Sequence, residues 1–408
     1  MQKGITKWIR EHYLKITGSI AFYPVLIAIG FLLLSVLMLE VDFSWEGKQF
    51  KGALSWIRLR DADTARSIVS TIAAGLISLT VFSFSMVMIV LNQAASQLSN
   101  RILENLIGNR SQQWVLGIYL GTIVYALFLL TSIRDIDSGT NIPALSIYLL
   151  ILLTVVDIFV FIYFLHFITQ SVKYQTLIQN ITKETHTALN KDKADHINHA
   201  PWKPEGERCE LRCPAAGYFQ DIRLSSLVKQ ACKEGFQLEF LHPKGTFLLQ
   251  DVPFVAIYSV RPVSKKQVDK LLLDVDFYPG QSIDVNALYG FKQLTEVAIK
   301  ALSPGINDPN TAVLCLHALS ALLAQRLRNT PPEVFSDEKG MARIFLPQQT
   351  FGDLVRLCLQ PVWHYGKNDQ FVQAALADLL QQLKFVSQEG KDNAIIDSML
   401  HEVKGHGK

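Results

Sequence analysis

The sequence has few of the features that mark a nucleic-acid-binding or disulfide-rich protein. Its net charge is only +3, and it contains no run of Lys and Arg residues, so no nucleic-acid partner is expected. The five cysteines are odd in number and irregularly spaced, which argues against a disulfide framework and fits a reducing compartment. Cys209 and Cys213 form a C-x3-C pair, but no second pair of metal ligands follows at a suitable spacing. We therefore expect free thiols, with no metal or other cofactor.

The chain also lacks the short motifs of the common enzyme classes. It has no nucleophile elbow, no glycine-rich phosphate loop, no H-E-x-x-H motif and no evident pair of catalytic carboxylates. Ser303, in a Ser-Pro-Gly sequence, has no base near it in the sequence. The sequence therefore does not predict an enzyme.

Apolar residues are abundant and unevenly distributed. They make up 49% of the chain, and most of the excess precedes Gln170. Apolar segments begin near residues 18, 67, 114 and 144, and a span of about 20 residues crosses a hydrocarbon core of about 30 Å. We predict an α-helical membrane protein with four transmembrane helices, followed by an α+β domain on one side of the membrane.

The basic residues favour one orientation. Four spans place both termini on the same side, and Lys3, Lys7, Arg10 and Lys15 form a basic cluster before the first span. Because basic residues concentrate on the cytoplasmic side, both termini and the soluble domain are expected there.

The second span carries a stripe of small and hydroxyl-bearing residues. Alternate steps of four and three residues, which follow one face of a helix, give Ser67, Thr71, Ala74, Ser78, Val81, Ser85 and, beyond Met88, Asn92. Such a face can line a water-filled path, in which hydroxyls replace part of an ion's hydration shell. It can equally serve close helix packing, the commoner use of small residues in membranes. Both interpretations stay open.

Ionisable residues at and inside the spans are further candidates. Arg60, Asp61, Asp63 and Arg66 precede the second span, where they form either a charged vestibule or paired charges at a helix start. Asp157 is the only acid in the fourth span. A carboxyl inside the membrane is a candidate functional group by default, although a protonated or hydroxyl-bonded aspartate can also hold helices together.

The remainder of the chain divides into segments that differ in residue pattern. The expected boundaries are a membrane domain over 1–170, a helical stalk and linker over 171–207, a small β-rich subdomain over 208–262, a helical subdomain over 263–390 and a flexible tail over 391–408.

The string ALSPGINDPNTA, residues 301–312, is the most distinctive in the chain. We expect a helix to end near Leu302 and a new helix to begin with Asn307 or Asp308 as its cap and Pro309 in its first turn. A helix N-terminus also offers free amides to a ligand. Ser303, Asn307 and Asp308 are therefore candidates for a ligand site, with capping as the alternative.

At this string the sequence resembles a family of bacterial predicted membrane proteins, grouped as a domain of unknown function, with four spans and a cytoplasmic C-terminal part. The resemblance covers most of residues 10–390, and GFKQLTEVAIK (290–300), DADTAR (61–66) and AAGYFQDI (215–222) also carry it. It implies a multi-pass protein of the bacterial inner membrane and a shared fold, but no activity for individual residues.

Two functions fit this organisation. Four spans are too few to enclose a transport path alone, so we favour a homo-oligomeric channel or channel-like protein with the second span near its axis. Its partners would be the lipid bilayer, further copies of the chain, and a small ion or solute. The alternative is a membrane-anchored sensor or scaffold whose cytoplasmic domain binds a ligand or a partner protein.

Overall fold

The computed structural model describes residues 21–45, 61–97, 110–133, 142–171, 173–191, 201–278, 282–387 and 391–406. The chain divides into two compact units, and the boundary lies between Lys173 and Tyr174. Each unit is described by itself below.

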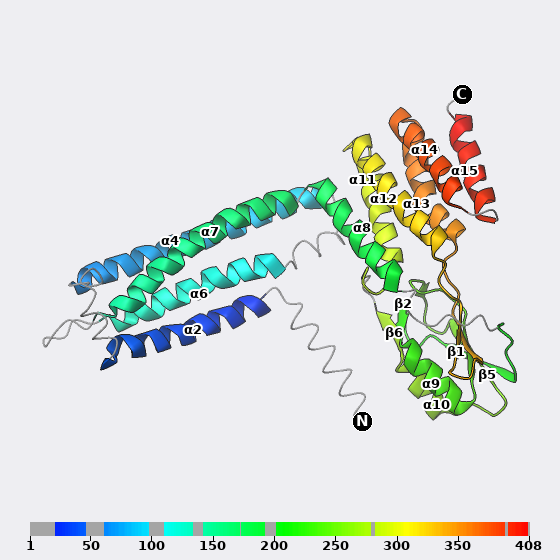
Figure 1. Cartoon of the computed structure of the whole chain (residues 1–408), viewed down its shortest axis with the longest axis horizontal. Helices are drawn as coiled ribbons and strands as arrows, with labels where there is room; N and C mark the ends of the chain where they lie inside the picture. Colours follow the sequence, from blue (N-terminus) through cyan, green and yellow to red (C-terminus); the bar gives the residue numbers. More distant parts are fainter. Residues whose placement is uncertain are drawn as a thin grey trace. The chain divides into compact units, whose positions relative to one another are not determined.

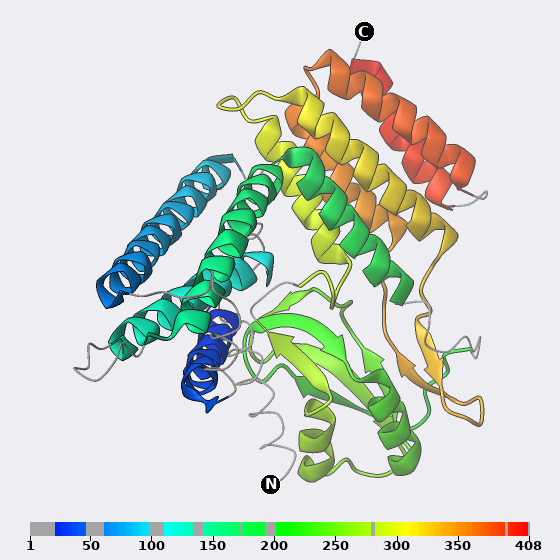
Figure 2. The same ribbon diagram turned by 60° about the vertical axis from the view of Figure 1, so that its left-hand side comes forward.

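Four long helices form the first unit and lie side by side (Figures 1 and 2). They are α2 (Phe22–Phe43), α4 (Ala62–Gln97), α6 (Arg110–Ser132) and α7 (Ala144–Ser171). Each contains a stretch long and apolar enough to cross a membrane, with mean hydropathies of 2.0 to 2.7. Together with the α and β elements of the second unit, these helices confirm the expected fold class.

Helix α6 is the centre of the membrane unit. It packs against α2, α4 and α7, and half of its most apolar stretch is buried, compared with 11% for α2 and α4. Gly117 and Gly121 of α6 allow α2 to approach closely. A Cβ atom at Gly117 would lie 2.5 Å from Ile27 Cδ1, and one at Gly121 would lie 2.7 Å from the Phe31 ring. The pair is a G-x-x-x-G motif, which permits close contact between helix backbones in membranes.

Two sheets form the β part of the second unit. One has the strand order β1-β5-β3-β8-β7 and the other β4-β2-β6. The strands are β1 (Glu207–Arg212), β2 (Gly217–Ile222), β3 (Gln237–Phe240), β4 (Phe247–Leu248), β5 (Pro253–Ser259), β6 (Val275–Tyr278), β7 (Val334–Ser336) and β8 (Ala342–Phe345). With α9 (Leu224–Glu234) and α10 (Lys265–Leu272), they enclose an apolar core that includes the stacked rings of Phe219 and Phe240.

Helices form the other part of the second unit. They are α8 (Tyr174–Lys191), α11 (Leu288–Ala301), α12 (Pro309–Arg328), α13 (Phe351–Gly366), α14 (Gln370–Val386) and α15 (Lys391–His406). Helix α12 contacts α8, α11, α13 and α14. Helix α8 lies against α11 at Gly290, where a Cβ atom would overlap with the side chain of Thr185. Only glycine allows this approach.

Some elements of the second unit differ from the sequence expectations. Strands β6, β7 and β8 come from the segment expected to be helical, and β8 pairs in parallel with β3 through Leu238 and Ile344. These strands have only three or four residues, too few to show an alternating pattern. In place of a flexible tail, residues 391–406 form α15, which buries Ile396, Met399 and Val403 at helical spacing. The other expected domain boundaries stay predictions.

Candidate functional site

The stripe of the second span lies on the outer face of α4. Every member singled out from the sequence, Ser67, Thr71, Ala74, Ser78, Val81, Ser85 and Asn92, is exposed in the isolated subunit. The opposite face contains Ala65, Val69 and Ala73, which pack against α6 and the rest of the core. Asn92 also lines a cavity beside α6. The stripe from Ser67 to Ser85 does not pack against the other described helices of its own chain, and packing within the subunit does not explain it.

Two hydroxyl groups of this outer face are satisfied by their own helix. Ser78 Oγ donates to Ala74 O at 2.9 Å, and Ser85 Oγ donates to Val81 O at 2.9 Å. At Gly75 a Cβ atom would meet nothing within 4 Å, so the face is open around it. The neighbouring Phe82 is 57% exposed. The face thus combines small and polar groups with bulky apolar neighbours, which suit contact with lipid or another chain.

The charged residues before the stripe have local partners. Asp61 caps α4, because its Oδ2 accepts from Thr64 N at 3.0 Å and from Thr64 Oγ1 at 2.6 Å. These hydrogen bonds from Thr64 lower the pKa of Asp61. Arg66 forms an ion pair with Asp63 at 3.2 Å and donates to Ile133 O at 3.4 Å. Arg60 lies outside the described residues. The bonds around Asp61, Asp63 and Arg66 match the structural alternative, and their role in a vestibule stays a prediction.

Asp157 is fully buried on α7. Its exposed fraction is 0%, and neither carboxylate oxygen has a hydrogen-bond partner among the described residues. The side chain of Thr122 on α6 adjoins it, and Tyr119 lies one turn before Thr122. The hydroxyls of Tyr119 and of Ser83 on α4 are also buried and without a partner in the described part of the chain. The structure thus gathers polar groups from three helices in the membrane unit.

Sequence reasoning missed the hydroxyl groups of this cluster. Ser83 belongs to the same helix as the outer stripe but lies on its inner face, with an exposed fraction of 5%. The one signal in the sequence was that Ser83 lies off the polar stripe of an apolar helix, where a hydroxyl group can bond across helices or to its own backbone.

A cavity of about 420 Å³ adjoins the polar cluster. Ser83 and Tyr119 line it at one place, and Asn92, Gln112 and Gln113 line it near the C-terminal end of α4 and the N-terminal end of α6. Most of the remaining wall is apolar, with Val87, Leu116, Phe164 and others of that kind. The cavity therefore joins polar groups at the helix ends to polar groups deeper in the unit.

The turn between α11 and α12 contains the distinctive motif. Asp308 caps α12, because its Oδ1 accepts from Thr311 N at 3.1 Å and its Oδ2 from Thr311 Oγ1 at 2.6 Å. Ser303 Oγ donates to Lys300 O at 2.6 Å. Asn307 takes the left-handed conformation, with φ of 50°, which asparagine tolerates better than most residues. Asp308 is therefore the helix cap, whereas Ser303 and Asn307 belong to the turn that precedes it, and a ligand here stays a prediction.

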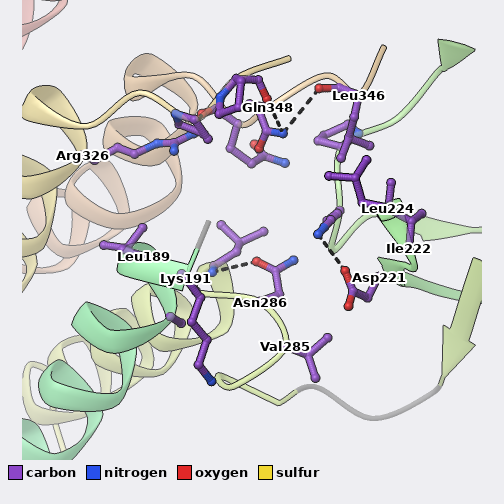
Figure 3. Close-up of a pocket in the computed structure, with 18 of the residues that line it drawn as sticks. Leu189, Lys191, Asp221, Ile222, Leu224, Val285, Asn286, Arg326, Leu346 and Gln348 are labelled. Carbon is purple, nitrogen blue, oxygen red and sulfur yellow. Dashed lines mark hydrogen bonds and ion pairs between the residues drawn. The ribbon is translucent and has the colours of Figure 1, made fainter. Parts of the chain in front are cut away.

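A second cavity of about 360 Å³ lies within the second unit, between its sheets and its helices (Figure 3). The cations lining it are Lys191 at the end of α8, Lys244 and Arg326. Lys244 is paired with Asp221 at 2.7 Å, and Arg326 donates to Gln349 O at 2.8 Å. The Asn286 amide nitrogen is buried there without a partner in the described part of the unit. The acids Asp221 and Asp284 also line it, so the cavity places groups of both charges around a space of small-molecule size.

Two of the buried cysteines, Cys315 and Cys358, are in surroundings that disfavour the reactive thiolate. All five are free, and burial raises the pKa values of Cys315 and Cys358 to about 12. A thiol with a raised pKa is a poor nucleophile and a poor metal ligand. Among the described residues, no group of three or more His, Cys, Asp and Glu side chains could hold a metal ion.

Comparison with known proteins identifies a family but no activity. The uncharacterized proteins Rv1290c of Mycobacterium tuberculosis and Mb1321c of Mycobacterium bovis are each 25% identical to this chain over 329 residues. The alignment covers 78% of this chain and 63% of each relative, so the chain spans less than two thirds of their length. No solved structure matches the chain. The family described as "Predicted membrane protein (DUF2254)" matches residues 17–382, and the chain belongs to this family of integral membrane proteins.

Proposed function

We propose that several copies of this chain assemble around the outer faces of α4 and form a channel-like path for a small ion or solute. The second unit would lie on the cytoplasmic side, as an assembly or regulatory domain. One observation carries the proposal: the small and hydroxyl-bearing stripe of α4 faces away from the other helices of its own subunit.

The physical argument concerns what can cover such a face. Small side chains leave lipid tails few atoms to contact, whereas they let another helix approach closely or leave room for water. Val81 lies between Ser78 and Ser85 on the stripe and is 60% exposed. A ring of valine side chains at an oligomer axis would make an apolar constriction, and such constrictions gate by dewetting.

Flux measurements with matched variants test the proposal. Purified protein in liposomes is expected to pass small ions, and Ser78→Leu or Ser85→Leu should reduce the flux by about tenfold or more, because leucine narrows the path and excludes water. Phe82→Leu is the control, since Phe82 is also exposed but lies off the stripe. Flux that is absent from the unsubstituted protein, or equally reduced in all three variants, would refute the channel.

The cavity of the second unit favours a second candidate function, a sensor that binds a small anion. Lys191 lies at its edge and is exposed. Inorganic pyrophosphate should raise the unfolding temperature of the full chain, and Lys191→Gln should weaken its binding by about tenfold. Lys183→Gln, on the same helix but outside this cavity, is the control. No stabilisation by pyrophosphate, or equal effects of both substitutions, would argue against this function.

A further inference from the structure

Asp157 lies at the midpoint of the α7 span, which runs from Ala144 to Gln170. The helix rise of about 1.5 Å per residue puts it about 20 Å from either end of that span. Its carboxyl group is fully buried and has no hydrogen-bond partner among the described residues. An ionised carboxylate is strongly disfavoured in such a place, so the group is neutral unless a proton can leave by a polar route.

The helices that pack against α7 bring hydroxyl groups and no opposite charge to this site. From α6, Tyr119 is the titratable group that faces Asp157. Thr122 adjoins the carboxyl as a hydrogen-bonding neighbour, although in the structure its hydroxyl donates to Ile118 O at 3.1 Å. From α4 comes the Ser83 hydroxyl, and the described part of that helix contains no charged residue after Arg66.

The remaining ionisable groups of these helices lie elsewhere. The acids of α2, Glu40 and Asp42, are in its last turn, and Asp42 contacts the N-terminus of α7 instead. His166 of α7 is exposed. Among the described residues no ion pair holds the charge on Asp157, which is therefore decided by burial and by nearby hydroxyl groups.

The cavity of about 420 Å³ reaches Ser83 and Tyr119, although Asp157 itself does not line it. Asn92, Gln112 and Gln113 line its part near the helix ends, and Ser83 and Tyr119 line it beside the polar cluster. A liquid water molecule occupies about 30 Å³, so several would fit, and the unpartnered hydroxyls of Ser83 and Tyr119 give them hydrogen-bonding partners.

We propose that Asp157 is a reversible proton-binding site of the membrane unit, and that Ser83 and Tyr119 pass protons between it and water in this cavity. A water molecule bridges the hydroxyl and the carboxylate in this step, since neither oxygen of Asp157 has a direct partner among the described residues. A hydronium ion in the cavity gives a proton to the hydroxyl oxygen, the hydroxyl passes its own proton to the bridging water, and that water passes one to Asp157. The hydroxyl and both water molecules end neutral, and the carboxylate becomes a carboxylic acid. The site lies within one subunit, so it does not depend on the proposed oligomeric channel.

Infrared spectroscopy of the full chain in liposomes tests the site. A protonated carboxyl has a C=O stretching band that shifts in D2O when its proton exchanges. The band is expected in the unsubstituted protein, should be absent from Asp157→Asn, and should be retained in Glu40→Gln, which removes an exposed acid from the same unit. Its intensity should fall as the pH rises. Absence of the band at every pH, or its persistence in Asp157→Asn, would overturn the site.

The proton route has its own readout. In D2O the band should shift promptly, and Ser83→Ala combined with Tyr119→Phe should slow the exchange by about tenfold or more. A band that neither titrates nor exchanges would mean a permanently neutral structural carboxyl and would overturn the proposal. Unchanged exchange in the double variant would overturn the role of Ser83 and Tyr119. If Asp157→Asn fails to fold, mapping of dicyclohexylcarbodiimide adducts on the unsubstituted chain assigns the protonated carboxyl, and an unlabelled Asp157 at low pH counts against the site.

Discussion

Two aspartates of the membrane unit, Asp42 and Asp157, are equally buried, at 0% exposure, and yet differ in their surroundings. Asp42 of α2 accepts hydrogen bonds from Leu145 N at 3.1 Å, from Ser146 N at 2.8 Å and from Ser146 Oγ at 2.5 Å. Asp157 accepts none from the described residues. Burial alone therefore does not reveal whether a carboxyl is structural, whereas its hydrogen-bond donors do.

The position of each aspartate along a helix explains the difference. Asp42 lies beside the first turn of α7, where backbone N–H groups have no partner inside their own helix and the helix dipole favours a negative charge. Asp157 lies at mid-helix, where every backbone N–H group is already used. A carboxyl at mid-helix can be satisfied only by side chains or water.

The largest loss of stability is expected at a third buried carboxyl, Asp337 in the second unit. This carboxyl forms an ion pair. Its Oδ2 accepts from Arg343 Nε at 2.8 Å, and both side chains are mostly buried. Asp337→Ala should lower the free energy of unfolding by about 4 kcal/mol, because it leaves the buried guanidinium of Arg343 without a partner. Urea unfolding of the full chain in detergent measures this, and a loss as small as that of an exposed pair would contradict the comparison.

The same pair should make the second unit sensitive to acid. Burial by itself would raise the pKa of Asp337, but the hydrogen bonds from Arg343, Met341 N and Lys339 N outweigh it and lower the pKa below the ordinary value. A carboxyl with a lowered pKa stabilises the fold above its unfolded pKa, and this contribution is lost as the pH falls through the folded value. Unfolding measured at pH values below about 4 should therefore show the loss, and Asp337→Ala should lack it.

The next largest loss of stability is expected at Asp42, which can be compared directly with Asp157. Asp42→Asn should lower the free energy of unfolding by about 2 kcal/mol, because the amide keeps the shape but brings N–H groups toward donors and removes the charge from the helix N-terminus. Thermal unfolding in detergent measures the change. A negligible effect would mean that the hydrogen bonds of Asp42 contribute little.

Asp42 also shows where sequence reasoning reached its limit. Hydropathy predicted the four membrane helices, because that signal is spread over about 20 residues and needs no tertiary information. The contact between Asp42 and Ser146 joins residues 104 positions apart, and no local pattern reports it. The close packing of α2 on α6 was partly predictable. Gly117 and Gly121 form a recognisable motif for close helix contact, but the motif does not indicate which helix is the partner.

The candidate sites likewise differ in how far the sequence alone could predict them. The stripe on α4 followed from helical spacing alone, and the structure places it on one exposed face. Asp308 was expected as a helix cap from its neighbours in sequence, and Thr311 supplies the donors. The cluster around Asp157 could not be assembled in advance, because Ser83, Tyr119 and Asp157 come from three different helices.

A smaller loss of stability is expected at Asp308, a carboxyl whose role as a helix cap was predicted from the sequence. Asp308→Ala should lower the free energy of unfolding by about 1 kcal/mol, the usual loss for an N-cap side chain. Asp308→Ser should restore most of it, because serine also caps helices. Urea unfolding measures both variants. A loss that serine does not restore would indicate that the carboxylate has a role beyond capping, as a ligand site at this turn requires.

The smallest change in stability is expected at Asp157. Asp157→Asn should change the free energy of unfolding by less than about 0.5 kcal/mol, because no described donor loses a partner and the amide has nearly the same volume. The matched substitution at Asp42 removes hydrogen bonds from equally buried donors, so the difference between the two variants, measured by thermal unfolding in the same detergent, isolates the contribution of those donors. Equal losses at the two positions would mean that Asp157 holds the helices together as Asp42 does. A stable Asp157→Asn variant would instead leave the carboxyl without a structural reason for its place in the membrane.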